Sequence, residues 1–130
     1  MLRIHPFIMG HLIGAVMTGA IAGAFINPQA SFIGALALFG GALVSCFICQ
    51  WRPGVEATAW KLWLIAVLAN PVMLAALGFM AVDWECVAGT RRGWNCLGVA
   101  MAIVAAGLCL LPPVGGLLWR WWKRRVAPVA

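Results

Sequence analysis

Long uncharged apolar stretches alternate with short polar segments along almost the whole chain. Four of these stretches are close to the roughly 20 helical residues that the hydrocarbon core of a bilayer requires. They cover residues 4–26, 31–50, 61–82 and 97–119. Within each stretch the apolar residues are continuous, which is typical of transmembrane helices and not of alternating barrel strands. We therefore predict an all-α integral membrane bundle of four transmembrane helices, forming one domain over residues 1–130.

The composition supports a membrane protein. Hydrophobic residues make up 65% of the chain and charged residues 9%, whereas about a quarter of the residues in a soluble globular domain are charged. The connecting segments are "NPQA", "WRPGVEATAW" and "DWECVAGTRRGWNC", so no soluble domain is expected.

An alternative interpretation of the first stretch is a signal peptide, with Arg3 as its positive region and "AIA" at 20–22 as its cleavage site.

The distribution of basic residues predicts the orientation, because short cytoplasmic loops carry an excess of Lys and Arg. Most of the nine basic residues share one side if it holds both termini and the second loop, namely Arg3, Arg52, Lys61, Arg120, Lys123, Arg124 and Arg125. We therefore expect both ends on the cytoplasmic side of a bacterial inner membrane, with a basic cytoplasmic tail at residues 120–130. The net charge of +6 then reflects topology and attraction to anionic lipid, and no soluble surface is left for nucleic acid.

Small residues, which let membrane helices approach one another, occur in the first two stretches at Gly10, Gly14, Gly19, Gly23, Gly34 and Gly41. At about 100° per residue, the pair Gly10 and Gly14 lies on the opposite side of the first helix from the pair Gly19 and Gly23. We therefore expect this helix to pack on both sides. The second helix is one expected partner, through Gly34, Gly41 and Ser45. The alternative is that glycine is simply common in membrane helices.

Prolines interrupt the third and fourth stretches, at Asn70-Pro71 and at Pro112-Pro113. Proline removes a backbone donor from a helix, so we expect bends at both places. In transporters such breaks can line a binding site, and in ordinary bundles they only shape the packing. Asn70 is a candidate ligand or pore residue, because its amide could cap a freed carbonyl or meet a ligand.

Ionisable groups are scarce inside the predicted helices. No Asp or Glu lies in any of them, so cation-coupled transport through a buried carboxylate, as in small four-span multidrug exporters, has no residue to use. His11 lies two turns into the first helix and could ligate haem or a pigment, but a bis-histidine haem needs a second inward His, and His5 lies on another face. We expect His11 to hydrogen-bond a neighbouring helix or to sit near the headgroups.

Bound lipid is the one small molecule expected, and no metal or cofactor is predicted.

Cys46 and Cys49 form a C-x-x-C pair at the end of the second helix. Together with Cys86 and Cys96 this inventory is similar to that of DsbB-type thiol oxidases, but the predicted threading puts the two pairs on opposite sides of the membrane, where they cannot exchange disulfides. A partial likeness to small bacterial mercury-uptake proteins implies that Cys46 and Cys49 could present two soft ligands to a thiophilic ion. The simpler interpretation is two small apolar residues at a helix end.

Cys86 and Cys96 bracket the turn between the third and fourth helices, on the outer side where disulfides persist in bacteria. We predict a disulfide between them, which would contribute about 3 kcal/mol by restricting the unfolded chain. The turn that it closes is the best candidate for a partner contact. Its candidate contact residues are Trp84, Arg91, Arg92 and Trp94.

No nucleotide-binding loop, catalytic triad or paired carboxylates are visible, so we do not expect an enzyme. The leading functional hypothesis is a small non-catalytic membrane subunit that packs against and stabilises a larger membrane protein complex, such as an energy-converting one. The second is a small homo-oligomeric transporter or channel. The third is a thiol redox protein or thiophilic-ion carrier that uses the C-x-x-C pair.

Overall fold

The computed structural model describes residues 4–52 and 54–126, and every regular element in these ranges is helical. The elements are α1 (Pro6–Ile26), α2 (Pro28–Trp51), α3 (Ala59–Leu68), α4 (Pro71–Val82), α5 (Trp84–Ala88), the 3₁₀-helix η1 (Trp94–Cys96), α6 (Leu97–Cys109) and α7 (Leu111–Val126). Three helical stretches are long and apolar enough to cross a membrane: α1, α2 and the continuous 33 residues Trp94–Val126. The bent pair α3 and α4 adds a fourth if it counts as one span. The all-helical prediction is therefore confirmed for the described residues.

The first turn is shorter than predicted. The sequence pattern assigns the segment "NPQA" to a turn, but Asn27 alone lies between α1 and α2. The Asn27 side chain accepts a hydrogen bond from the backbone N–H of Ala30 at 2.8 Å, and Pro28 occupies the first helical position. An asparagine cap followed by proline is a strong helix start, so α2 begins three residues before the predicted position 31.

Helix α1 packs between α2 and α7. A Cβ atom on Gly19 would overlap the backbone of Gly34 in α2, and one on Gly23 would likewise overlap the backbone at the start of α2. On the other side, a Cβ atom on Gly10 would overlap α7, and Gly14 lies against the same helix. The two glycine pairs therefore serve two different contacts, because the helical period turns them to opposite sides.

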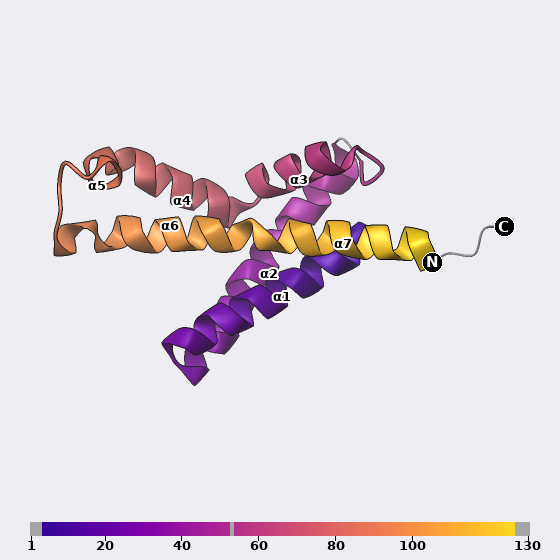
Figure 1. The fold of residues 1–130 in the computed structure, drawn as a ribbon, viewed down its shortest axis with the longest axis horizontal. Coiled ribbons are helices and arrows are strands. Elements are labelled where there is room, and N and C mark those ends of the chain that lie inside the picture. Colours follow the sequence, from indigo (N-terminus) through magenta and orange to yellow (C-terminus); the bar gives the residue numbers. More distant parts are fainter. Residues whose placement is uncertain (1–3, 53, 127–130) are drawn as a thin grey trace.

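The two proline breaks differ. At Asn70 the axes of α3 and α4 are bent by 65°, which confirms the bend expected there. The bend expected at Pro112-Pro113 is wrong, because α6 and α7 continue as one long stretch (Figure 1). Both prolines lie in the first turn of α7. Backbone N–H groups in a first turn have no hydrogen-bond partner within the helix, so their absence in proline costs little there. The Trp63 indole also donates a hydrogen bond to the carbonyl of Leu110 at this junction, at 3.3 Å.

The chain forms two hairpins, α1–α2 and α4–α6, which diverge from the region where α1 crosses α7 (Figure 1). The start of α1, the end of α2, the start of α3 and the end of α7 gather at one end of the molecule, and α5 lies toward the other. We call the first end the basic end, because its described part carries Arg52, Lys61, Arg120, Lys123, Arg124 and Arg125. Arg3 and residues 127–130, which belong to the predicted cytoplasmic side, lie outside the described residues. The predicted tail is helical up to Val126.

A few polar bonds tie the apolar core together where the helices cross. The buried Ser45 hydroxyl of α2 donates to the carbonyl of Ala66 in α3 at 2.6 Å. Near the basic end, the Arg120 guanidinium of α7 donates to the carbonyl of Ala57, which precedes α3, at 2.9 Å. Helix α3 is thus held against its neighbours by backbone carbonyls as well as by apolar contact.

Candidate functional site

The largest structured connection is the segment 83–96 between α4 and α6, which we call the disulfide loop. Helix α5 ends at Gly89, which has a φ of 78°, and a second turn is made at Gly93, with a φ of 119°. Both values lie in the left-handed region that glycine adopts without a steric penalty. The two glycines therefore allow the chain to reverse twice and bring the ends of the loop together.

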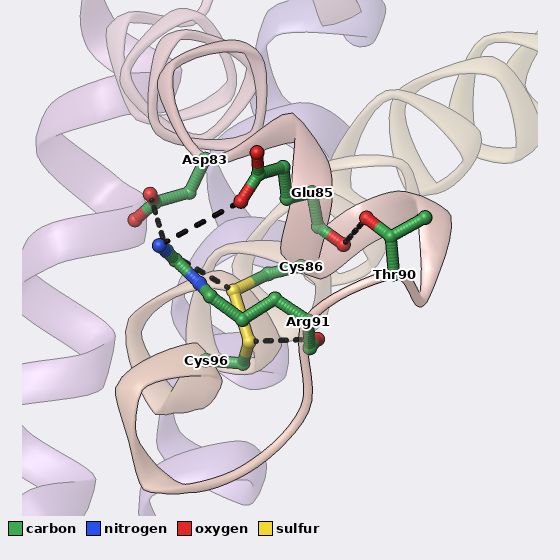
Figure 2. Close-up of polar contacts among 6 residues, drawn as sticks. All are labelled: Asp83, Glu85, Cys86, Thr90, Arg91 and Cys96. Atoms are coloured by element: carbon green, nitrogen blue, oxygen red, sulfur yellow. Dashed lines mark hydrogen bonds and ion pairs between the residues drawn. A yellow bond between two sulfur atoms is a disulfide. The ribbon is translucent and has the colours of Figure 1, made fainter.

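Cys86 and Cys96 lie at disulfide-bonding distance, with their Cα atoms 5.5 Å apart (Figure 2). This agrees with the predicted pairing. The carbonyl oxygen of Arg91 lies 3.2 Å from the Cys96 sulfur, and the Thr90 hydroxyl donates to the carbonyl of Glu85 at 3.1 Å. The loop is consequently held by one covalent bond and by contacts of its own backbone.

Arg91 is exposed, and its guanidinium turns toward acidic groups of its own loop. Its guanidinium lies 2.9 Å from an Asp83 carboxylate oxygen and 3.9 Å from one of Glu85, as Figure 2 shows. It also approaches the Cys86 sulfur at 3.6 Å. Arg91 therefore pairs within its own loop, and its role as a partner contact stays a prediction. The pairs are partly exposed, so each contributes at most about 1 kcal/mol.

The other predicted contact residues of the disulfide loop are exposed. Trp94 is 90% exposed and Trp84 is 64% exposed, and Arg92 is exposed as well. Exposed tryptophans are typical both of membrane–water interfaces and of protein contacts. The exposed surface of this loop is therefore aromatic and carries one cation, Arg92, outside the ion pairs of Arg91.

His11 is the most unusual polar residue of the interior. It is fully buried, packs edge-on against Phe7 with ring centroids 5.5 Å apart, and neither ring nitrogen has a hydrogen-bond partner among the described residues. The expected hydrogen bond to a neighbouring helix is not found among the described residues, and the alternative place near the headgroups stays a prediction. His11 shares its helical stripe with Phe7 and Ala15, which are also fully buried where α1 is covered by its neighbours. An unpaired buried imidazole is costly.

Asn70 acts as a helix cap. Its side-chain oxygen accepts a hydrogen bond from the backbone N–H of Val72 at 3.0 Å and so begins α4. The residue is 1% exposed and lies against Gly41, where a Cβ atom would come within 2.5 Å of the same oxygen. The expectation that Gly41 and Ser45 face α1 is corrected, because Gly41 accommodates Asn70 and Ser45 bonds to α3. The 65° bend brings the start of α4 against α2 and explains this change of partner.

The C-x-x-C pair, Cys46 and Cys49, lies in the last turns of α2, near the basic end, and both thiols are buried. Cys86 and Cys96 lie in the disulfide loop toward the opposite end (Figure 1), so the structure does not bring the two pairs together. Cys109, the third free cysteine, is buried in the core cluster with Ala15 and Leu38. Among the described residues no group of three or more His, Cys, Asp or Glu side chains could hold a metal ion.

Comparison with protein-family models, with curated proteins and with solved structures finds no match. The function of this chain therefore has to be inferred from its own geometry.

Two polar residues near the basic end have structural roles that the sequence interpretation missed. Arg120, counted as a surface cation, is 8% exposed and bonds to Ala57. His5 accepts a hydrogen bond from the backbone N–H of Phe7 through Nδ1 at 3.2 Å and caps α1, while its Nε2 lies 3.8 Å from Glu56. The burial of Arg120 could have been predicted from its position four residues after Gly116, because this spacing places both residues on the buried face of α7.

Proposed function

We propose that this chain is a small non-catalytic integral membrane subunit of four spans, with both ends on the cytoplasmic side of a bacterial inner membrane. The length and apolar character of α1, α2 and Trp94–Val126 support the spans, with α3 and α4 as one bent span. The gathering of cations at the basic end supports the orientation. Reporter fusions test it: a fusion after residue 130 is active only in the cytoplasm, and one inside the disulfide loop only outside. The opposite pattern would overturn this orientation.

The observation that carries the subunit proposal is a set of outward glycines. Gly40 in α2, Gly78 in α4 and Gly107 in α6 are exposed, and a Cβ atom at any of them would meet no described atom of another helix within 4 Å. Glycine costs up to about 1 kcal/mol relative to alanine inside a helix. The glycines that face α1, α2 and α7 offset that cost by close packing within the chain. The outward ones have no such contact with the described residues, and small residues are the usual surface for association between membrane helices.

The partner is a larger membrane protein that places helices against these glycines. The exposed tryptophans of the disulfide loop provide a second contact outside the bilayer. Extraction in mild detergent, with the assembly mass measured and attached chains identified by mass spectrometry, tests the proposal. We expect unrelated polypeptides in fixed stoichiometry, whereas a homo-oligomer alone would overturn the subunit proposal.

A matched pair of substitutions locates the interface on α2. Gly40→Leu adds bulk at an outward glycine, and Ala37→Leu adds bulk at an exposed alanine of the same helix. Both variants should fold, because a Cβ atom at Gly40 meets no described neighbour and Ala37 is also on the surface. We expect Gly40→Leu to lose most of the co-purifying chains and Ala37→Leu to keep them. Equal retention in both variants would remove Gly40 from the interface.

His11 favours a second candidate function, a small homo-oligomeric transporter or channel. An ionisable residue inside a membrane span is a candidate for a proton or ion pathway, and His11 has no partner in the described chain. Vesicles containing the purified protein and an internal pH dye test this role. A proton flux that disappears in His11→Phe would support the transporter, and an equal flux in both proteins would exclude His11 from a proton path.

A further inference from the structure

A groove runs between α1 and α7 on the surface of the molecule, with a volume of about 480 Å³. Helix α1 lines it with Gly10, Ile13, Gly14 and Met17. This spacing of three, four and seven residues places all four on one face of the helix. The groove therefore follows the axis of α1 for about two turns and is not a local pit.

Helix α7 lines the opposite wall with the same spacing, through Gly115, Leu118, Trp119 and Trp122. The two helices approach closely at the base, where a Cβ atom on Gly115 would lie 3.1 Å from the carbonyl oxygen of Gly10. Glycines of both helices form the base of the groove, where they have no side chains to fill it, and apolar side chains form the walls. The result is a long and almost entirely apolar groove, whose volume is that of a typical small-molecule site.

One end of the groove carries positive charge. The Trp122 ring forms part of the wall, and the Lys123 ammonium lies 5.5 Å from the centroid of that ring. All the charged residues of α7 are basic. Glu56, the acidic residue of the loop before α3, lies beside His5 at 3.8 Å. The groove thus runs from an apolar region near the middle of the spans to the basic end.

We propose that the groove binds one acyl chain of an anionic phospholipid, with the lipid headgroup beside Lys123. An alkyl chain matches the long apolar shape, and tryptophan rings at one end are typical of the level of lipid headgroups. A lysine at the cytoplasmic face attracts anionic headgroups, and it does so here at the mouth of the groove. The proposal rests on the membrane placement proposed above and is independent of any partner complex.

The geometry favours a lipid over a helix from another protein. A helix with its side chains is about 10–12 Å across, and close contact between membrane helices is favoured by small residues at the contact. The glycines of this groove extend over only part of it, because Trp119 and Trp122 occupy the wall near the basic end. An alkyl chain is narrower than a helix and can pass beside these rings, so the groove fits a lipid chain better than a helix.

Native mass spectrometry of the delipidated full-length protein in detergent tests the site. The probes are dioleoyl phosphatidylglycerol, which is anionic, and dioleoyl phosphatidylcholine, which has the same chains without net charge. We expect one phosphatidylglycerol per chain to be retained at activation energies that remove phosphatidylcholine. Equal retention of the two lipids would overturn the role of the headgroup.

Two matched pairs of variants separate the groove from general lipid binding. Leu118→Trp fills the groove from an exposed wall position, and Leu111→Trp adds the same ring at an exposed position of α7 outside the groove. Lys123→Gln removes the cation at the mouth, and Lys61→Gln removes a lysine that also lies over the preceding tryptophan, in α3. We expect Leu118→Trp to abolish retention and Lys123→Gln to weaken it about fivefold, while both controls retain the lipid.

The outcomes distinguish this site from the subunit proposal. Retention that is unchanged in Leu118→Trp, or lost equally in both members of a pair, would overturn the groove as the lipid site. The groove would be assigned to a protein helix instead if position 118 cross-linked to another polypeptide in native membranes and the isolated chain retained no lipid. Failure to find partner chains on purification would not affect the measurement, because lipid is counted on the isolated chain.

Discussion

The two hairpins of the molecule are held together in different ways. In α1–α2 a single residue, Asn27, connects the helices, and Gly19 faces the backbone of Gly34. In α4–α6 the connection is the disulfide loop. The glycine at that helix contact, Gly98, faces the ring of Phe79, which would lie 2.9 Å from an added Cβ atom. Close backbone contact near the turn constrains the first hairpin, whereas a covalent link at its end constrains the second.

Reduction of the disulfide should have the largest effect and should act on the second hairpin. We expect the free energy of unfolding to fall by about 3 kcal/mol, because the bond between Cys86 and Cys96 restricts the unfolded chain. Unfolding in detergent with and without a reductant measures this loss. Hydrogen exchange should show lower protection in α4 and α6 than before, with α1 and α2 unchanged. The double variant Cys86→Ser/Cys96→Ser is the control and should not respond to the reductant.

The second-largest effect should come from substitution of packed glycines, whose loss of stability should differ between the two hairpins. Gly19→Ala should destabilise the protein by about 2 kcal/mol, because the added methyl group overlaps backbone that can move only with the helix. Gly98→Ala should change stability by less than about 1 kcal/mol, because the Phe79 ring can turn away and alanine favours a helix. Thermal unfolding in detergent measures both. Equal losses in the two variants would contradict the distinction between backbone and side-chain contact.

The one-residue turn of the first hairpin should depend on its cap. Asn27→Ala removes the acceptor for the Ala30 N–H and should cost about 1 kcal/mol, measured by thermal unfolding in detergent. Asn27→Asp keeps an acceptor at the start of α2 and should retain most of the stability. A loss as large in Asn27→Asp as in Asn27→Ala would show that the side-chain amide, and not the cap, is required.

The cap of α1 should show the smallest effect, which depends on pH. Burial lowers the pKa of His5 from its usual 6.5, Arg120 and Arg124 lower it further, and Glu56 raises it. As the pH falls, His5 is therefore protonated in the unfolded chain before it is protonated in the folded protein. The stabilisation by His5 is complete above about pH 6.5 and is lost as the pH falls through the lower pKa of the folded state. The imidazolium also cannot accept the hydrogen bond from Phe7.

Unfolding measured between about pH 5 and pH 8 tests this cap, in a range set by the ordinary histidine pKa of about 6.5. His5→Asn keeps a capping acceptor without a titrating group and serves as the control. We expect its unfolding free energy to depend less on pH than that of the original protein. An unchanged pH dependence would assign the effect to another group.

Much of the helical layout could be predicted from local features. The apolar stretches place the helices, and the proline after Asn70 predicts the bend of α3 and α4. The same rule fails at Pro112-Pro113, because these prolines begin α7 and leave α6 and α7 in line. The pairing of Cys86 with Cys96 was predictable as well, since two cysteines on one short loop have few alternatives.

The sequence by itself determined the helices, their apolar character, the charge of the basic end and the short-range disulfide, because these depend on neighbouring residues. Only the tertiary structure decided which neighbour each packed glycine meets, and it placed Gly41 against Asn70 instead of α1. It also buried His11 without a partner among the described residues and turned Arg91 toward its own loop. These outcomes depend on the register and crossing of helices and on the folding of the loop, which no local pattern specifies.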